Sequence, residues 1–239
     1  MDVLLVHGFT QTGASWARVR AALPERYRAL TPDLRGHGSA GDARPVNLES
    51  VIGDLARRAG ERLILCGYSM GGRIALHAAL APAFAGRVER LVLIGASPGI
   101  ADARERAVRR ADDERLAEEI ERAPGIQAAA RRWAQTPVLA DQRPDVAALA
   151  HADRQRNTPA GLARALRGLG TGALPSLWAR LDELAMPVAL VVGERDAKFC
   201  AIAKDMATRI AFAEVVLAAG AGHAVHLEAP EVVAAAIAR

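Results

Sequence analysis

The most constraining feature of the chain is the segment of residues 63–73, with the sequence LILCGYSMGGR. Four apolar residues suited to a buried strand are followed by G-x-S-x-G and then by residues suited to a helix. A strand passes directly into a helix only through a sharp turn, where Gly67 and Gly71 remove side chains that would collide. Such a turn exposes the hydroxyl of Ser69 beside the positive end of the helix. The segment therefore predicts Ser69 as a catalytic group, with a structural Gly/Ser turn as the alternative.

The rest of the chain alternates short apolar runs with helix-length segments, a pattern typical of a mainly parallel sheet with crossover helices. Each run is continuously apolar, as expected for strands that are covered on both faces. The 239 residues suit one domain of the larger α/β kind. The candidate strands occupy residues 3–6, 27–31, 63–66, 91–94, 188–192 and 215–217.

Helices are expected between these runs. They cover residues 15–23, a segment with Asn47 as its N-cap, residues 70–80 and residues 231–238. Residues 100–184 break the pattern, because they contain no clear strand and are rich in Arg, Glu and Ala. We expect several short helices there, inserted between two strands as a cap over the active-site edge. The chain then divides into a core of residues 1–99 and 185–239 and a helical cap of residues 100–184.

A serine becomes a useful nucleophile or base only with a histidine and a carboxylate, which follow it in that chain order in this type of turn. Asp196 lies just past the strand of residues 188–192, and His223 lies just past the next strand. Both positions fall at the carboxyl ends of strands, where open α/β sheets carry their sites. We predict Ser69, His223 and Asp196 as the triad. Glu194 is the competitor for the acid, and His226, which we expect to anchor its loop by a hydrogen bond, is the competitor for the base.

The first candidate strand is followed by His7-Gly8-Phe9, which supplies the third part of such a site. Backbone amides of Phe9 and Met70 are predicted to form an oxyanion hole. We expect His7 to hold its loop through side-chain hydrogen bonds rather than to react. The charged residues of the turn-rich loop 33–38 are likewise interpreted as structural.

Arg73 follows Ser69 by four residues, one turn along the same helix. A guanidinium in that buried position is unfavourable without an anionic partner. The partner is either a carboxylate of the protein or a carboxylate of the substrate, and we favour the substrate.

Composition excludes several other classes of protein. The formal net charge is +4, but there is no long Lys/Arg run and aromatic residues are only 4%, which argues against nucleic-acid binding. No apolar run reaches the roughly 18 residues needed to span a bilayer, and the first residues resemble a strand rather than a leader. We expect a cytoplasmic protein, a monomer or homodimer, in which Cys66 is a buried free thiol. Neither a His/Cys spacing for a metal nor a dinucleotide glycine pattern is visible, so no metal or cofactor is expected.

This pattern, from His7 to the final helix, resembles the α/β-hydrolase superfamily. Members of that superfamily usually begin with an antiparallel hairpin before the His-Gly strand, whereas this sequence starts at that strand. We therefore expect a sheet of about six strands rather than eight.

A narrower resemblance rests on motifs spread over nearly the whole chain. They are GYSMGGR (67–73), GASPG (95–99), Trp133 with Pro137, RNTPAGLA (156–163), GLGTG (168–172), SLW (176–178), GERDAKF (193–199) and GHAVHLE (222–228). In this order they resemble the 2-succinyl-6-hydroxy-2,4-cyclohexadiene-1-carboxylate synthase family of menaquinone biosynthesis. That family eliminates pyruvate from a cyclohexene that bears succinyl, carboxylate and enolpyruvyl groups.

The resemblance implies a lyase whose triad abstracts a proton and whose substrate is a small polycarboxylate. It further implies that Arg73 binds a carboxylate, and that Tyr68 and Trp133 line the pocket. A cap arginine should correspond to Arg156, although the spacing from Trp133 equally selects Arg154. Another should correspond to Arg106 or Arg104, with a solvated helix face as the alternative for all of these cap arginines. Lys198 is a weaker candidate.

Two other functions stay open at this point. A cofactor-free serine hydrolase, acting on esters or on carbon–carbon bonds of diketones, would use the same triad. Neutral esters would not need Arg73, which therefore discriminates between the two reactions. A non-catalytic binding protein is the remaining alternative, and the complete triad argues against it.

Overall fold

The computed structural model describes residues 1–136, 139 and 142–239. Its strands are β1 (Asp2–Val6), β2 (Arg28–Leu30), β3 (Leu63–Tyr68), β4 (Val88–Ile94), β5 (Val188–Gly193) and β6 (Ala213–Ala218). Its α-helices are α1 (Ala17–Ala22), α2 (Leu48–Arg58), α3 (Met70–Ala79), α4 (Ala103–Glu121), α5 (Ile126–Ala134), α6 (Pro144–Arg154), α7 (Pro159–Leu169), α8 (Ala197–Ala207), α9 (Val225–Glu228) and α10 (Pro230–Ala238). Short 3-10 helices cover Gly13–Trp16 (η1), Gly38–Ala40 (η2), Pro82–Phe84 (η3) and Trp178–Glu183 (η5).

The six strands form one sheet in the order β2-β1-β3-β4-β5-β6, and every neighbouring pair is parallel. This confirms the expected fold class and the expected number of strands. The order runs outward in opposite directions from β1 and β3, so these two strands flank the point where the winding reverses. Ligands of open α/β sheets bind outside the carboxyl ends of the strands at such a point. The residues after β1 and after β3 are therefore the best placed for a site.

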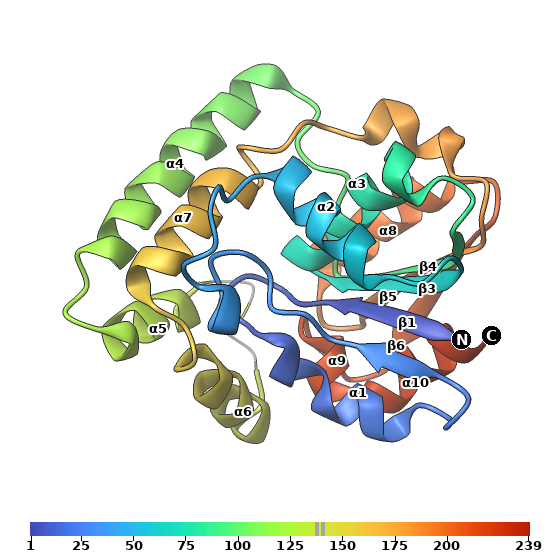
Figure 1. Ribbon diagram of the computed structural model, residues 1–239, viewed down its shortest axis with the longest axis horizontal. Helices are drawn as coiled ribbons and strands as arrows, with labels where there is room; N and C mark the ends of the chain where they lie inside the picture. The colour runs from blue at the N-terminus through green and yellow to red at the C-terminus, as the bar shows by residue number, and fades with distance from the viewer. Residues whose placement is uncertain (137–138, 140–141) are drawn as a thin grey trace.

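The two faces of the sheet bury different sets of side chains. Along β1, Leu4 and Val6 belong to one apolar cluster, which also takes in residues of α2, α3 and α8. Val3 and Leu5 belong to the other cluster, with residues of α1 and α10. Figure 1 shows the same two helical layers on either side of the strands. Because successive side chains of a strand point to opposite faces, each continuous apolar run supplies buried side chains to both faces of the sheet.

The prediction that all strands are covered on both faces is wrong for β6. Val215 and Leu217 are 40% and 55% exposed, and both lie at alternate positions of the strand. β6 is the edge strand of the sheet, so the helices that cover β3–β5 do not extend fully over its outer face. The apolar run correctly indicated a strand but not its place in the sheet.

The described residues between β4 and β5 form helices joined by loops. They contain α4, α5, α6, α7 and η5, with no strand. Helices α4 and α7 pack extensively on each other and contribute Ile120, Leu162 and Leu166 to the same apolar cluster as α2 and α3. These helices gather at one side of the sheet (Figure 1). The cap therefore shares a core with the sheet domain instead of forming a separate body.

Local expectations at helix ends and at cysteine are also met. The side chain of Asn47 accepts a hydrogen bond from the Ser50 amide at 2.9 Å, an N-cap of the kind worth about 1 kcal/mol. Cys66 is a fully buried free thiol. None of the helices within the described residues is both long and apolar enough to cross a membrane.

Candidate active site

Ser69 lies on a strained turn between β3 and α3. Its backbone has φ +52° and ψ −111°, a left-handed conformation that residues with a side chain rarely adopt. The flanking glycines make the turn possible, because a Cβ on Gly67 would lie 2.4 Å from the Gly71 carbonyl oxygen. A Cβ on Gly71 would lie 2.2 Å from the Val6 carbonyl oxygen. The turn is therefore as the motif indicated, with Met70 as the first residue of the helix.

His223 and Asp196 complete a continuous line of polar contacts with Ser69. Nε2 of His223 is 3.2 Å from Oγ of Ser69, and Nδ1 of His223 is 2.6 Å from Oδ2 of Asp196. The other oxygen of Asp196 accepts a hydrogen bond from the Phe199 amide at 3.3 Å. A Cβ at Gly95 would lie 2.9 Å from Cε1 of His223, so the imidazole packs where only glycine fits. Such a line can take the proton from Oγ and stabilise the resulting imidazolium.

The loop before His223 is fastened from within the sheet domain. Glu228, whose side chain is only 1% exposed, accepts hydrogen bonds from the Gly222 amide at 2.9 Å and from Arg195 at 3.0 Å. Arg195 also donates to the Gly220 carbonyl at 3.0 Å. Glu194, the competitor for the acid, accepts instead from the Gly220 amide at 2.8 Å. Its carboxylate therefore braces this loop and makes no contact with His223.

The loop after β1 lies on the other side of Ser69. Nε2 of His7 accepts a hydrogen bond from the Leu34 amide, and Nδ1 contacts the Gly8 carbonyl, both at 2.9 Å. Burial lowers the pKa of His7 to about 4, so its ring is neutral and donates to Gly8. This is the loop-holding role predicted from the sequence. Phe9 and Met70 both line the cavity beside Ser69, and the first amides of a helix such as α3 have no partner within the helix.

A cavity of about 610 Å³ opens between this edge of the sheet and the cap. Ser69 and His223 line it, together with the aromatic side chains of Trp133, Trp178 and Phe199. Three cationic side chains also line it: Arg73, Arg109 and Lys198. The cavity therefore combines the reacting groups with apolar walls and positive charge, which suits a small anionic ligand.

A family model described as the alpha/beta hydrolase family matches residues 3–236. The chain belongs to the α/β-hydrolase family. Its relatives include a putative 2-succinyl-6-hydroxy-2,4-cyclohexadiene-1-carboxylate synthase of Bacillus subtilis, 35% identical over 95% of this chain and 85% of the relative. A synthase of the same name from Klebsiella pneumoniae is 36% identical over 99% and 92%.

Solved structures agree with these relatives. The structure of MenH from S. aureus superposes with a TM-score of 0.92 at 29% identity, over 100% of this chain and 92% of that one. A malate-bound thermophilic esterase from Thermogutta terrifontis gives 0.82 at 27% identity, over 100% and 88%. This α/β hydrolase is thus an enzyme, and its relatives carry out more than one kind of reaction.

Arg73 of this α/β hydrolase is 8% exposed and forms no ion pair with any carboxylate among the described residues. One terminal nitrogen donates to the hydroxyl of Thr171, and Nε has no hydrogen-bond partner in the described part of the chain. Burial and, to a smaller extent, the positive charge of Arg109 lower the pKa of Arg73 to about 10, against the attraction of Asp113. The question left open by the sequence is therefore answered in one respect: none of the carboxylates in the described part of the chain pairs with Arg73.

The predicted cap arginines are only partly in the right place. Arg156 has a side chain 63% exposed, pairs with Asp153 at 3.6 Å and does not line the cavity, so its prediction as a pocket residue is wrong. Arg154, the alternative, is 3% exposed and lines a narrow side cavity with Tyr68, Ser69 and His223. The reason is that α6 ends at Arg154, so the chain has turned outward by Arg156.

The same correction applies to the first cap helix. Arg106 donates to the carbonyls of Ile100 and Ala101, and Arg104 is exposed; neither lines the cavity. Arg109, one turn further along α4, lines it instead and donates to Asp113 at 2.7 Å. Lys198 and Trp133 do line the cavity as predicted, whereas Pro137 lies outside the described residues.

The prediction that His226 anchors its loop by a hydrogen bond is wrong. Its ring is fully buried, and neither nitrogen has a hydrogen-bond partner among the described residues. It stacks on Tyr68 at a centroid distance of 4.1 Å and contacts Trp16 at 5.0 Å. The ring therefore acts as a packing group under the site. By contrast, Asp33 in the loop 33–38 accepts from the Gly13 and Ser39 amides, which agrees with the structural role expected of it.

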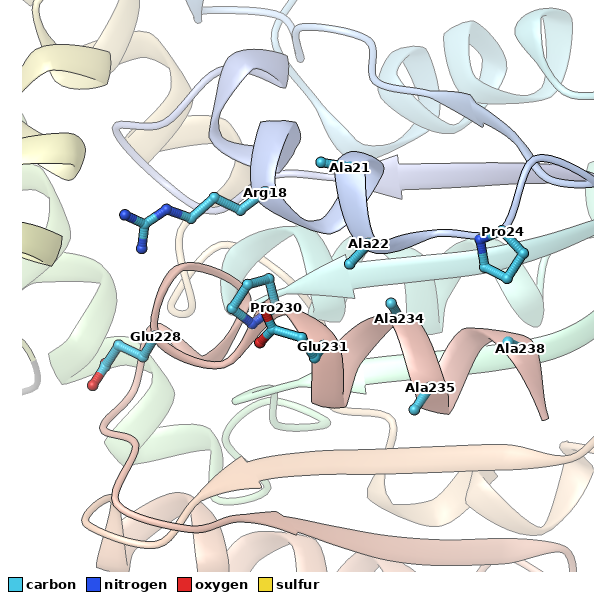
Figure 2. A pocket seen from close by; sticks show the side chains of 10 residues that line it. All are labelled: Arg18, Ala21, Ala22, Pro24, Glu228, Pro230, Glu231, Ala234, Ala235 and Ala238. Carbon is cyan, nitrogen blue, oxygen red and sulfur yellow. The ribbon is translucent and has the colours of Figure 1, made fainter.

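A second hollow of this α/β hydrolase lies away from the site. It is a groove of about 780 Å³ between α1 and α10, shown in Figure 2. Alanine and proline side chains form most of it, with Arg18, Glu228 and Glu231 as its charged members. None of the predicted site residues lines this groove, so the cavity beside Ser69 is the candidate site.

Proposed function

We propose that this enzyme eliminates pyruvate from 2-succinyl-5-enolpyruvyl-6-hydroxy-3-cyclohexene-1-carboxylate, a step of menaquinone biosynthesis. The observation that carries the proposal is Arg73, a buried cation one helical turn from Ser69 with no carboxylate partner among the described residues. A substrate carboxylate would supply that partner. The relatives named as synthases of the corresponding product support the same reaction.

The proposed mechanism begins with proton transfer. His223, oriented by Asp196, accepts the proton of the Ser69 hydroxyl, and Oγ removes the ring proton next to the succinyl carbonyl. The electron pair of that C–H bond moves through the ring double bond and breaks the carbon–oxygen bond to the enolpyruvyl group. Two conjugated double bonds remain in the ring, and the departing enolate becomes pyruvate when it takes up a proton.

Negative charge builds on the succinyl carbonyl oxygen as the ring proton leaves. In the proposed mechanism, the amides of Phe9 and Met70 donate hydrogen bonds to that oxygen. Donors placed where charge develops are worth about 10²–10³-fold in rate each. This part of the machinery would also serve ester hydrolysis, so it does not by itself choose between the two reactions.

The distribution of positive charge supports the polycarboxylate substrate. Arg73, Arg109 and Lys198 line the main cavity, and Arg154 lies in the side cavity on the other side of Ser69. The substrate carries carboxylates on its succinyl, ring and enolpyruvyl groups, so its charges are spread around the reacting carbon. Cations on both sides of the serine match such a molecule better than a neutral ester.

The test is a pyruvate-release assay with the enolpyruvyl cyclohexene substrate, run beside hydrolysis of p-nitrophenyl acetate and butyrate. We expect pyruvate release with kcat/KM above about 10⁴ M⁻¹s⁻¹, an ordinary value for an enzyme, and feeble ester cleavage. Brisk ester turnover without pyruvate would instead class the protein with hydrolases such as the structurally similar Thermogutta terrifontis esterase.

A further inference from the structure

The segment Phe9–Thr12 has a backbone that needs to be held from outside. Thr10 has φ +66°, and apart from Ser69 it is the only residue with a side chain at positive φ within the described chain. A β-branched residue rarely adopts this conformation unless its surroundings enforce it. The amide of Phe9, the proposed oxyanion donor, lies one residue before this strained position. What fixes Thr10 therefore also fixes the direction of that amide.

The contacts that hold this segment come largely from the cap. Asn157, 5% exposed and located between α6 and α7, donates from Nδ2 to the Thr10 carbonyl at 2.9 Å. The same Nδ2 donates to the Arg154 carbonyl at 3.1 Å, and Oδ1 accepts from the Gly38 amide at 3.0 Å. One buried amide thus joins the cap, the loop after β1 and the loop after β2.

Asp153 provides a second attachment two residues further along the segment. Its Oδ2 accepts from the Thr12 amide at 2.9 Å, and its Oδ1 accepts from the Thr12 hydroxyl. The residue is 7% exposed, and burial raises the pKa of its carboxyl group. Two other ionisable groups act on the same carboxyl group: Arg156, whose Nε is 3.6 Å from Oδ1 of Asp153, lowers its pKa, and Asp33 raises it. Burying a carboxyl group here is unfavourable unless it is hydrogen-bonded, and Thr12 supplies those bonds.

We propose that Asp153 and Asn157 are positioning residues: they hold the Thr10–Thr12 backbone and so aim the Phe9 amide at the developing oxyanion. This inference rests on the oxyanion role given to Phe9 in the proposed function. It makes the oxyanion hole dependent on the cap, although Phe9 belongs to the sheet domain. Arg154 lies between the two positioning residues and donates to the Thr10 hydroxyl at 3.4 Å, so carboxylate binding and oxyanion stabilisation share one short segment.

The main test is Asn157→Asp, which keeps the size of the side chain and the acceptor for Gly38 but removes the donor to Thr10. The matched control is Arg164→Gln, because Arg164 on α7 also joins the cap to the core, through the Gly41 carbonyl at 2.8 Å, without touching residues 9–12. Asp153→Asn is the second variant and retains one acceptor for Thr12, so it keeps the test usable if Asn157→Asp does not fold.

Three rates are compared among these variants: pyruvate release, hydrolysis of p-nitrophenyl butyrate, and labelling of Ser69 by a fluorophosphonate. In the labelling reaction Oγ of Ser69 attacks phosphorus, fluoride leaves, His223 takes the hydroxyl proton, and the phosphoryl oxygen enters the oxyanion hole. This rate does not require the natural substrate. The Ser69→Ala variant, which lacks the attacking hydroxyl, gives the background rate of labelling.

For Asn157→Asp we expect kcat and the labelling rate constant to fall together by about 10- to 100-fold, with KM changed less than about threefold. Asp153→Asn should show a smaller loss of the same kind, and Arg164→Gln should match the wild type. Equal losses in Asn157→Asp and Arg164→Gln, or a rise in KM alone, would overturn the inference, because either result indicates general cap docking. Labelling that depends on Asn157 in a protein that releases no pyruvate would refute the proposed substrate and keep the positioning role.

Discussion

Different physical requirements determine the residues of the turn that carries Ser69 and the residues of the cap that covers it. At the turn, close backbone approach decides the residues: Gly67 and Gly71 each lie where a Cβ would come within 3 Å of a backbone oxygen. In the cap, long side chains decide the function: Arg109 of α4 and Arg154 of α6 line the cavities, whereas Arg104, Arg110 and Arg115 of α4 are exposed. The sheet edge therefore determines what can react, whereas binding draws on both parts, through Arg73 of α3 and through Arg109 and Arg154 of the cap.

The two loops beside Ser69 repeat this contrast. The loop before His223 is fastened by Glu228 and Arg195 of the sheet domain, whereas the segment after β1 is attached to Asp153 and Asn157 of the cap. The base should thus keep its position whatever the cap does. The following predictions test this division, starting with the reacting group.

The largest effect is expected at the sheet edge. Ser69→Ala should lower kcat for pyruvate release by about 10³-fold or more, because the atom that removes the ring proton is absent. Carboxylate binding should persist, since the cations of the cavity are unchanged. Steady-state assays and calorimetric titration with the substrate measure the two quantities. Turnover near that of the wild type would refute the catalytic role of Ser69.

Arg73→Met should lower kcat/KM by a factor that corresponds to about 2–5 kcal/mol of lost transition-state stabilisation, because a substrate carboxylate loses its buried partner. Methionine keeps much of the volume, so packing around α3 should survive. Removing a buried cation that pairs with none of the described carboxylates should leave the melting temperature unchanged or higher. Loss of activity together with gain of stability separates a binding role from a structural one, and an unchanged kcat/KM would show that Arg73 is structural.

Within the cap, two arginines two residues apart should behave differently. Arg154→Met should lower kcat/KM by a factor that corresponds to about 1.5–3 kcal/mol, the range for a hydrogen bond to a charged group. Arg156→Met is the matched control and should stay within about twofold, because its exposed ion pair with Asp153 is worth little. Steady-state kinetics of both variants test the difference. The reverse order of effects would restore the original prediction of Arg156.

The smallest effect concerns His226 beneath the site. Burial lowers its pKa to about 3, from an ordinary 6.5, so the folded protein binds fewer protons than the unfolded chain between these values. This group's stabilising contribution is fully present above pH 6.5 and is lost as pH falls toward 3. His226→Leu should therefore flatten the pH dependence of the unfolding free energy by up to about 1.4 kcal/mol per pH unit.

Urea unfolding at pH 4.5 and 7.5 measures this slope. Exposed His151 on α6 offers the control, since His151→Leu should leave the difference between the two pH values unchanged. If His226→Leu shows the same difference as the wild type, His226 is protonated in the folded protein and the packing role assigned to it is wrong.

The sequence predicted the sheet and the arrangement of Ser69, His223 and Asp196 because both depend on local rules. Apolar runs locate buried strands, and the glycines of the Ser69 turn are required by its backbone. The catalytic roles of these residues stay predictions until the variants are measured. The same local rules missed the edge position of β6, which depends on where the sheet ends.

The pocket residues of the cap were harder to predict, because an arginine in the sequence does not show whether its side chain faces solvent or a cavity. A usable signal was nevertheless present in the helical spacing. Val146, Ala150 and Arg154 follow each other at intervals of four and are all buried, whereas Arg156 lies beyond the end of α6. In α4 the same interval joins Arg109, Asp113 and Ala117, and the last two are buried. The lack of hydrogen bonds at His226, by contrast, follows only from tertiary packing.

The exposed outer face of β6 has a consequence for self-association. An edge strand with solvent-facing Val215 and Leu217 is a template on which another chain can add a strand. Glu214 lies on the same strand and pairs with Arg90 at 3.2 Å and with Arg239 at 2.7 Å. A strand added at this edge would bring its side chains beside these charges, which disfavours an apolar partner strand. Neutralising Glu214 should therefore reduce colloidal stability before it affects the fold.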